Sequence, residues 1–366
     1  MKALLNILAW FYKVAIVLRH RLYDWGVLKS RSFDIPIVCI GNITVGGTGK
    51  TPTAEYLLSE LSSHYTIAIL SRGYGRRTKG YREVHVGDSY LDVGDEPLQM
   101  KLKFSDSVVV VSENRVLGIE RIRKEHPEVN LIIMDDGFQH RKVRAKVNIV
   151  LVDATRPIEG DKMLPAGRLR DIPSRTKSAH FFIVTKCSDQ MSPLDKRLYH
   201  KKLRSIAYQK VYFSTVRPCG IEPLFAFADR EPAYYSQQAI LMSAIGNPRP
   251  FMSEAETRFN VVDRFVFADH HRYDSDDMRK VYESLKKNHR AIVLMTEKDA
   301  VKLRRARLPE ALMRAMYYQP IEMALLEGPD RDFIPNLIAE IEAKDQSEIK
   351  GKERGSDNIP GIDFEE

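Results

Sequence analysis

Short apolar strings alternate with helix-length segments along the first two hundred residues of the chain. Each string is bounded by polar turn residues, and continuous apolar runs of this kind are typical of strands buried on both faces of a parallel sheet. We therefore predict an α/β sandwich domain over residues 26–210, built on a mainly parallel sheet with helices on both sides. Its strands are expected at 35–40, 66–70, 107–111, 131–134, 147–152 and 181–184.

A change in the sequence pattern separates the first domain from a second, smaller α/β domain. Segment 211–225 is punctuated by Pro218, Gly220 and Pro223, and we interpret it as a hinge linker. We predict the C-terminal domain over 226–342 and, because its composition is charged and almost devoid of apolar residues, a disordered tail over 343–366. The second domain is expected to have strands at 239–244, 261–267 and 291–296 and helices at 276–288 and 308–316.

The N-terminal stretch 3–18 is rich in aliphatic and aromatic residues. It is shorter than the roughly 20 apolar residues that a bilayer span needs, and no small-residue cleavage site follows it. Trp10 and Phe11 lie close to Lys13, and such amphipathic side chains settle at the depth of lipid headgroups. We predict a membrane-interfacial helix over 1–25; the alternative is a first helix packed into the core.

Length, charge and cysteine content narrow the possible classes of function. A chain of 366 residues suits two domains, and its net charge of +8 favours anionic partners. Nucleic acid is not an expected partner, because the chain has no interleaved aromatic and basic motif and no helix-turn-helix pattern. The three cysteines have no CxxC spacing, so neither a disulfide framework nor a zinc site is indicated.

The string GNITVGGTGKT follows an apolar strand and precedes a helix-forming segment, which is the context that a phosphate-binding loop requires. Glycines allow backbone N–H groups to converge on phosphates, Lys50 would pair with the β- and γ-phosphates of ATP, and the Thr51 hydroxyl would bind Mg²⁺. The loop is a variant, because Thr44 stands where the strict pattern has its first glycine. The predicted nucleotide-binding residues are Gly46, Gly47, Thr48, Gly49, Lys50 and Thr51.

Two carboxylates, Asp135 and Asp136, come directly after the apolar string 131–134. In nucleotide-binding enzymes with a phosphate loop, an acid at the end of a neighbouring strand holds Mg²⁺ opposite the loop threonine. We predict that both aspartates are metal ligands together with Thr51. Two adjacent aspartates in a solvated turn are the alternative.

Several longer strings carry a resemblance to a known family. GNITVGGTGKTP, SRGYGR, VGDEP, DDGFQH, LPAGRLRD, ADHHRY and TEKDAVKL occur in the order found in the tetraacyldisaccharide 4′-kinase family, and the resemblance covers residues 1–305. It implies an ATP- and Mg²⁺-dependent kinase that phosphorylates the 4′-hydroxyl of a tetraacyl disaccharide 1-phosphate, an anionic glycolipid of lipid A biosynthesis. It also implies a peripheral or monotopic protein at the cytoplasmic face of the inner membrane, for which we favour a monomer.

The resemblance also implies an acid and an imidazole that act together. Asp95 in VGDEP matches the acid thought to activate the acceptor hydroxyl, and its partner is expected from His270 or His271, of which we favour His271. A carboxylate tuned by an imidazole can take a proton from a sugar hydroxyl. The alternatives are that Asp95 caps a helix and that the two histidines form a surface pair or a satisfied core pair.

Two further candidates come from loops that the resemblance covers. In LPAGRLRD, Asp171 stands where the family pattern has glutamate, and we predict a metal ligand there with a shorter arm. Arg72 follows the end of a predicted strand, where ligands of open α/β sheets gather. Because guanidinium groups bind phosphate bidentately, Arg72 is a candidate for contact with ATP or with the phosphate of the lipid, the alternative being a solvated charge run.

A function of a different class must be weighed beside the lipid kinase. Proteins with deviant phosphate loops also act as nucleotide-switched ATPases, which bind a membrane or protein partner without phosphorylating it. A switch has no need of Asp95 and its histidine partner, so the acid and imidazole set favours the kinase.

Overall fold

The computed structural model describes residues 2–226, 237–326 and 332–343. Its larger sheet has nine strands in the order β14-β8-β7-β6-β1-β5-β2-β4-β3, and all neighbours pair in parallel except β14 with β8 and β3 with β4. The predicted mainly parallel α/β fold is confirmed. The strands are β1 (Ile37–Gly41), β2 (Ile67–Ser71), β3 (Arg82–Glu83), β4 (Val108–Val111), β5 (Leu131–Met134), β6 (Val147–Asp153), β7 (Phe181–Thr185), β8 (Lys210–Pro218) and β14 (Ile321–Leu325).

Helices cover both faces of this sheet. Val38 and Ile40 of β1 point to one face, whereas Ile37 and Cys39 point to the other, and each pair joins a different apolar cluster. Residues of α2 (Lys50–Leu61), α4 (Asp95–Lys103) and α12 (Phe333–Glu342) pack on the first face, and residues of α1 (Lys2–Asp24) and α5 (Arg115–Glu125) pack on the second. The remaining helices are α3 (Tyr90–Val93), the 3-10 helix η1 (Pro173–Ser178) and α6 (Pro193–Leu203).

The smaller sheet has five strands in the order β11-β10-β12-β13-β9, of which only β9 runs antiparallel to its neighbour. Because β11 and β12 flank β10 on opposite sides, the strand order reverses at β10. The strands are β9 (Glu222–Pro223), β10 (Gln238–Ser243), β11 (Asn260–Val266), β12 (Ile292–Thr296) and β13 (Met316–Gln319). The helices are α8 (Arg249–Arg258), α9 (Ser275–Lys287), α10 (Glu297–Leu303) and α11 (Glu310–Arg314).

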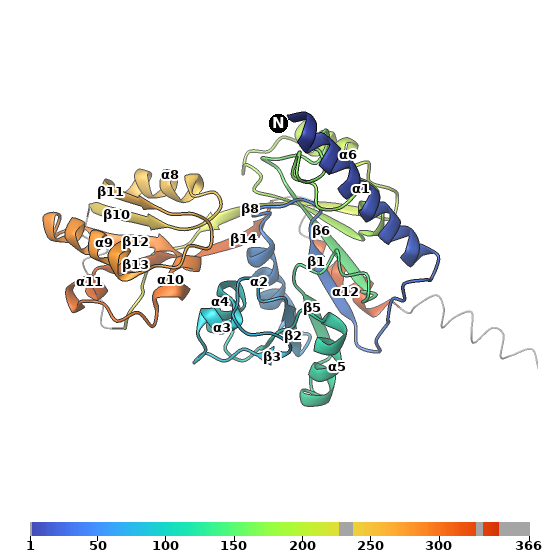
Figure 1. The fold of residues 1–366 in the computed structure, drawn as a ribbon, viewed down its shortest axis with the longest axis horizontal. Helices are drawn as coiled ribbons and strands as arrows, with labels where there is room; N and C mark the ends of the chain where they lie inside the picture. Colours follow the sequence, from blue (N-terminus) through green and yellow to red (C-terminus); the bar gives the residue numbers. More distant parts are fainter. Residues whose placement is uncertain (1, 227–236, 327–331, 344–366) are drawn as a thin grey trace, which may run out of the picture.

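After the smaller sheet the chain returns to the larger one, which differs from the predicted C-terminal domain over 226–342. β14 pairs with β8, from Ile321 against Pro218 to Leu325 against Ser214, and α12 buries Phe333 in the core of the larger sheet. The partner of β14 lies about a hundred residues earlier, so local patterning could not reveal this return. Figure 1 shows β8 and β14 running from the larger sheet towards the smaller one.

We name the two parts by their residues. The N-terminal body comprises 2–218, 321–326 and 332–343, and the C-terminal body comprises 222–226 and 237–319. The predicted linker 211–225 contains most of β8 and all of β9, so the chain leaves the larger sheet as a strand. Of the predicted tail, residues 344–366 lie outside the described residues.

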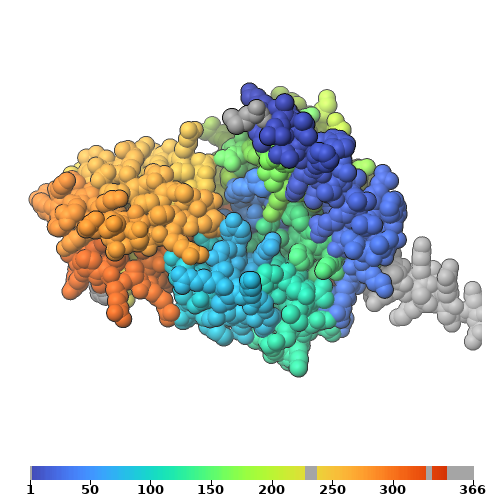
Figure 2. All heavy atoms as spheres, in the orientation of Figure 1, coloured from blue at the N-terminus to red at the C-terminus, as the bar shows by residue number. Residues whose placement is uncertain are grey.

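The N-terminal helix α1 lies on the surface of the N-terminal body, where Figure 2 shows it in dark blue. It packs through a narrow stripe that includes Ala9, Tyr12 and Ile16, while seven large apolar side chains stay exposed. By length and composition alone it is also a helix that could cross a membrane. The exposed side chains are Leu4, Ile7, Leu8, Trp10, Phe11, Val14 and Leu18.

Candidate active site

The glycine-rich loop joins β1 to the first turn of α2. Gly46 and Gly49 have φ angles of 104° and 83°, a left-handed conformation that glycine adopts without steric cost. The helix begins at Lys50, so the backbone N–H groups of its first turn and its positive dipole end face the loop. The predicted residues from Gly46 to Thr51 therefore lie together in a geometry suited to phosphate.

Side chains from neighbouring segments hold this loop in shape. Asn42 donates a hydrogen bond from Nδ2 to Thr48 Oγ1 at 2.8 Å, and Thr185 donates from Oγ1 to the Thr48 carbonyl at 2.9 Å. Lys186, whose φ of 58° is rare for a residue with a side chain, donates to the Gly47 carbonyl and to Asp153. Backbone strain of this kind collects at functional sites.

Asp135 and Asp136 lie at the end of β5, the strand next to β1. The side chain of Asp136 lies 3.9 Å from Lys50 Nζ and forms an ion pair with Arg170. Burial favours a higher pKa for Asp136, but the hydrogen bond from Arg170 and the charge of Lys50 outweigh it and hold the pKa below its usual value. Asp136 is therefore charged at neutral pH.

Asp135 is only 2% exposed, and its Oδ1 atom has no hydrogen-bond partner among the described residues. Burial, followed by the charges of Glu96 and Asp136, raises the pKa of Asp135 to about 7. A buried carboxylate oxygen without a partner fits a cation that completes the site. Among the described residues no group of three or more His, Cys, Asp and Glu side chains could hold a metal, so Mg²⁺ would depend on the two aspartates, the Thr51 hydroxyl and phosphate oxygens.

The raised pKa of Asp135 predicts a pH-dependent stability. Between the ordinary carboxyl pKa near 4 and about 7, the folded protein binds more protons at this site than the unfolded chain, so its contribution to stability is lost as the pH rises through 7. We expect the metal-free Asp135→Asn variant to melt at a higher temperature than the wild type at pH 8. The difference, roughly 2–4 kcal/mol in the free energy of unfolding, should shrink towards pH 5 in thermal scans.

Asp136→Asn is the matched control, because its pKa is shifted in the opposite direction. Its lowered pKa stabilises the fold above the unfolded pKa, and that stabilisation is lost as the pH falls through the folded pKa. The Asn variant should therefore be less stable than the wild type at neutral pH. Equal pH profiles for the two variants would contradict the assignment.

Asp95 is the first residue of α4 and is 5% exposed. Its Oδ1 atom accepts a hydrogen bond from the Glu96 backbone N–H, and its Oδ2 atom lies 3.0 Å from His270 Nδ1 in the C-terminal body. Burial favours a higher pKa for Asp95, but the hydrogen bond to His270 and the charge of Lys298 outweigh it and lower the pKa. Asp95 therefore begins a helix and also pairs with a histidine, so the two interpretations of this residue are compatible.

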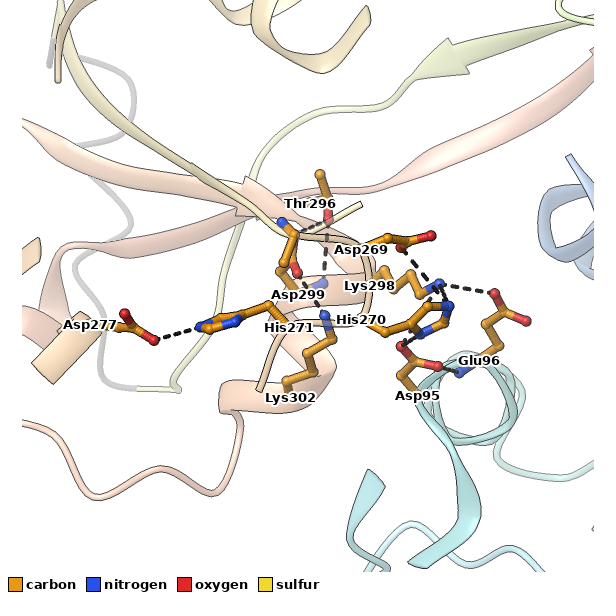
Figure 3. Close-up of polar contacts among 11 residues, drawn as sticks. Asp95, Glu96, Asp269, His270, His271, Asp277, Thr296, Lys298, Asp299 and Lys302 are labelled. Atoms are coloured by element: carbon orange, nitrogen blue, oxygen red, sulfur yellow. Dashed lines mark hydrogen bonds and ion pairs between the residues drawn. The ribbon is translucent and has the colours of Figure 1, made fainter. Parts of the chain in front are cut away.

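The structure joins His270, and not the favoured His271, to Asp95. His271 Nε2 instead lies 2.7 Å from Asp277 Oδ2, and its ring stacks on Phe267 with centroids 4.7 Å apart. Figure 3 shows the two histidines pointing in different directions, His270 towards α4 and His271 towards Asp277. His270 has a φ of 58°, and this left-handed turn sends adjacent side chains apart, a feature that two consecutive histidines do not reveal in sequence.

Lys298 is a member of this group that the sequence analysis did not single out. Its Nζ atom lies 3.0 Å from Glu96 Oε1, 3.4 Å from His270 Nε2 and 3.8 Å from Asp95 Oδ2, so it faces all three side chains (Figure 3). Burial favours a lower pKa for Lys298, but the charges of Glu96 and Asp95 outweigh it and raise the pKa. The string TEKDAVKL contains this lysine, but the string alone does not show that its side chain meets residues of α4.

The prediction that Asp171 ligates a metal is not supported. Its carboxylate is buried against α1, where Oδ1 lies 2.6 Å from His20 Nε2. The residue before it, Arg170, takes part in the phosphate site instead, because its guanidinium group donates to Asp136 and to Asn42. The side chains of Arg170 and Asp171 therefore point to different parts of the molecule, one to Asp136 and the other to α1.

Arg72 is exposed at the end of β2, and no hydrogen bond or ion pair is recorded for it within the described ranges. It lies within electrostatic reach of His140, whose pKa is lowered to about 4 by burial and by the charges of Arg115, Arg19 and Arg72. Arg115 is buried beneath Asp135 and donates to its carbonyl at 3.3 Å. His140 could have been singled out because it ends the DDGFQH string. Arg115 could not, because it begins an ordinary amphipathic helix.

Comparisons with known proteins identify the family of the chain. The chain matches the family described as tetraacyldisaccharide-1-P 4′-kinase over residues 1–340. It is 40% identical over 346 residues to a tetraacyldisaccharide 4′-kinase of Porphyromonas gingivalis (92% of this chain, 96% of that protein) and 39% identical over 341 residues to one of Bacteroides fragilis (90% of each).

A solved structure supports the fold independently. The crystal structure of LpxK from Aquifex aeolicus in complex with ATP superposes with a TM-score of 0.73 at 24% identity and covers 93% of this chain and 99% of that chain. The phosphate loop, the paired aspartates and the family match over almost the whole described chain lead to one conclusion. This chain belongs to the tetraacyldisaccharide-1-P 4′-kinase family.

Proposed function

We propose that this chain transfers the γ-phosphoryl group of ATP to the 4′-hydroxyl of a tetraacyl disaccharide 1-phosphate in lipid A biosynthesis. The observation that carries the proposal is the contact between Asp95 and His270, which joins an acid and an imidazole from different bodies. The charge of Glu96, next to Asp95, contributes to the raised pKa of Asp135, so this pair lies within electrostatic reach of the phosphate site.

Asp95 acts as the proton acceptor for the sugar hydroxyl. As the hydroxyl oxygen bonds to the γ-phosphorus and the bond from the γ-phosphorus to the bridging oxygen breaks, the hydroxyl proton passes to the Asp95 carboxylate and ADP leaves. His270 orients that carboxylate, and Lys298 keeps it charged. With a lowered pKa Asp95 is a weak base, which suits a transition state in which the phosphoryl group is already loosely bound.

Cations and backbone N–H groups bind the triphosphate. Lys50 pairs with the β- and γ-phosphates, and Arg170, whose guanidinium group already contacts Asp136, faces the same site. Thr51, Asp135 and Asp136 are the residues that would hold Mg²⁺, which would supply positive charge to the triphosphate during transfer. Bending between the bodies, along β8 and β14, would close this site and exclude water.

The phosphate of the acceptor is the expected partner of the cations around His140. The charges of Arg115, Arg19 and Arg72 all lower the pKa of this histidine, so the potential around it is positive, and of the three arginines Arg115 is buried and would act on an anion only through its charge. Arg72 is exposed and available for such a contact. This arrangement supports an anionic glycolipid as the acceptor.

Incubation with γ-labelled ATP, Mg²⁺ and a tetraacyl disaccharide 1-phosphate in mixed micelles tests the function. Label in the glycolipid, absent with the Lys50→Ala variant, is the expected result. Label that appears only in inorganic phosphate would instead favour the nucleotide-switched ATPase, the alternative that the family comparisons do not favour.

We further propose that α1 binds the surface of the cytoplasmic leaflet of the inner membrane. Replacing Trp10 and Phe11 together by serine removes two exposed aromatic side chains from its outer face. Since burying one such side chain contributes about 1.5–3 kcal/mol, losing two should lower the partition onto anionic liposomes by at least about 100-fold in flotation assays. The chain offers an exposed apolar control in Val266 on β11, far from α1 in sequence.

Val266→Ser should float like the wild type, and added salt should weaken flotation because basic residues flank the apolar face. Flotation of the Trp10 and Phe11 double variant at the wild-type level would exclude α1 as the membrane contact. Catalysis towards a short-chain soluble acceptor should be unaffected, which separates membrane binding from chemistry.

A further inference from the structure

Several hydrogen bonds tie α1 to the two loops that carry the phosphate site. Tyr12 Oη donates to the Arg170 carbonyl at 3.0 Å, and Arg19 donates to the Gln139 carbonyl at 2.9 Å. His20 Nε2 lies 2.6 Å from Asp171 Oδ1, and Arg141 donates to the His20 carbonyl at 3.0 Å. Apolar packing alone would need none of these contacts.

The pair of His20 and Asp171 is the most buried of these contacts. The residues are 4% and 1% exposed, and Asp171 Oδ1 also accepts a hydrogen bond from the Ile172 backbone N–H at 2.8 Å. Asp171 Oδ2 has no partner among the described residues. A buried carboxylate that already lacks one partner depends strongly on the other, because losing His20 would leave it almost without hydrogen bonds away from water.

A continuous set of contacts leads from this pair to the phosphate loop. Arg170, adjacent to Asp171, donates from Nη1 to Asp136 Oδ2 at 3.1 Å and from Nη2 to the Asn42 carbonyl at 3.2 Å. Asn42 in turn donates to Thr48 within the loop. The backbone follows the same path, since Arg170 N donates to the Ile43 carbonyl at 2.9 Å.

We propose that His20 is a positioning residue that sets the phosphate site through Asp171 and Arg170. With His20 in place, the loop around residues 168–172 is fixed, and the Arg170 guanidinium is aimed at Asp136 and at the triphosphate. Without it, the loop must shift to hydrate Asp171, which draws Arg170 away from Asp136. The helix that presents the membrane-facing side chains is thereby also a structural support of the nucleotide site.

The test measures binding of a non-hydrolysable ATP analogue with Mg²⁺ to the full chain, without lipid acceptor. His20→Ala should weaken this binding by about 10- to 100-fold, the usual effect of removing a supporting hydrogen bond behind a ligand-binding group. His20→Gln retains an N–H donor at a similar reach and should restore most of the affinity. His64→Ala, at an exposed histidine after α2, should bind like the wild type.

A double-mutant cycle shows whether His20 acts through Arg170. Arg170→Gln should weaken analogue binding by itself, and adding His20→Ala should then have little further effect. Fully additive losses would mean that His20 does not act through Arg170, and wild-type affinity of His20→Ala would overturn the proposal outright. If His20→Ala fails to fold, Tyr12→Phe, which removes only the donor to the Arg170 carbonyl, should still weaken binding, and no change would count against the proposal.

Hydrogen exchange provides a second readout. Amides at 168–172 should exchange faster in His20→Ala than in the wild type, while amides of the C-terminal body should not change. The proposal depends on the proposed kinase function only where turnover is measured. Because analogue binding and hydrogen exchange need no acceptor, failure of the glycolipid assay would leave this test intact.

Discussion

Replacing Asp95 by asparagine should lower kcat by about 10²- to 10⁴-fold, the usual contribution of a positioned general base. Asparagine keeps the size of the side chain and can still pair with His270, but it cannot accept the hydroxyl proton. ATP affinity should stay at the wild-type level, because Lys50, Thr51 and the loop glycines are untouched. Steady-state phosphorylation of the glycolipid together with calorimetry of an ATP analogue measures both quantities.

The chain provides a matched control in its second pair of a histidine and an aspartate. His271 and Asp277 form a contact of similar length, 2.7 Å, but neither touches Asp95. His270→Gln should lower kcat, whereas His271→Gln should leave it within a few-fold of the wild type. Wild-type turnover by Asp95→Asn, or equal losses in the two histidine variants, would remove the pair of Asp95 and His270 from the mechanism.

Replacing Lys50 by alanine should strongly weaken nucleotide binding. A hydrogen bond to a charged group contributes about 1.5–3 kcal/mol, so the loss of the lysine should weaken ATP-analogue binding by about 100-fold. Removing a cation from the transferred phosphoryl group should lower kcat by a further 10²- to 10³-fold. Calorimetry and glycolipid labelling measure the two effects separately.

Lys124→Ala, at an exposed lysine near the end of α5, controls for the loss of one positive charge. Its nucleotide affinity and turnover should match the wild type. The interpretation of the loop as a phosphate site would have to be abandoned if Lys50→Ala bound the analogue as tightly as this control. Circular dichroism of both variants excludes unfolding as the cause of a loss.

Local patterns predicted most of the fold. The string 131–134 is the strand β5 without change, and each other predicted strand of the larger sheet differs from the observed one by at most two residues at an end. Such strands are predictable because they are buried on both faces, so the apolar run and the strand coincide. The loop from Gly46 to Thr51 was predictable for a similar reason, since its residue types and its geometry are both set by the phosphate.

Contacts between distant segments were not predictable in this way. His270 and His271 have the same chemistry, and only the left-handed backbone at His270 decides which of them reaches Asp95. The resemblance suggested a metal role for Asp171, but the partner of that residue, His20, lies in a helix whose sequence indicated only membrane contact. Lys298 lies in α10 of the C-terminal body, and its contact with Asp95 depends on how the two bodies pack together.

The return of the chain through β14 and α12 bears on the order in which the protein is assembled during synthesis. Phe333, Leu337 and Ile341 fill the same apolar cluster as Leu57 and Leu61, so the N-terminal body cannot close its core until the last described helix has left the ribosome. The final strand of the C-terminal body, β13, ends at Gln319 and emerges earlier. The part that begins later in the sequence is therefore complete first, and the nascent N-terminal body exposes an unfilled apolar face until α12 has emerged.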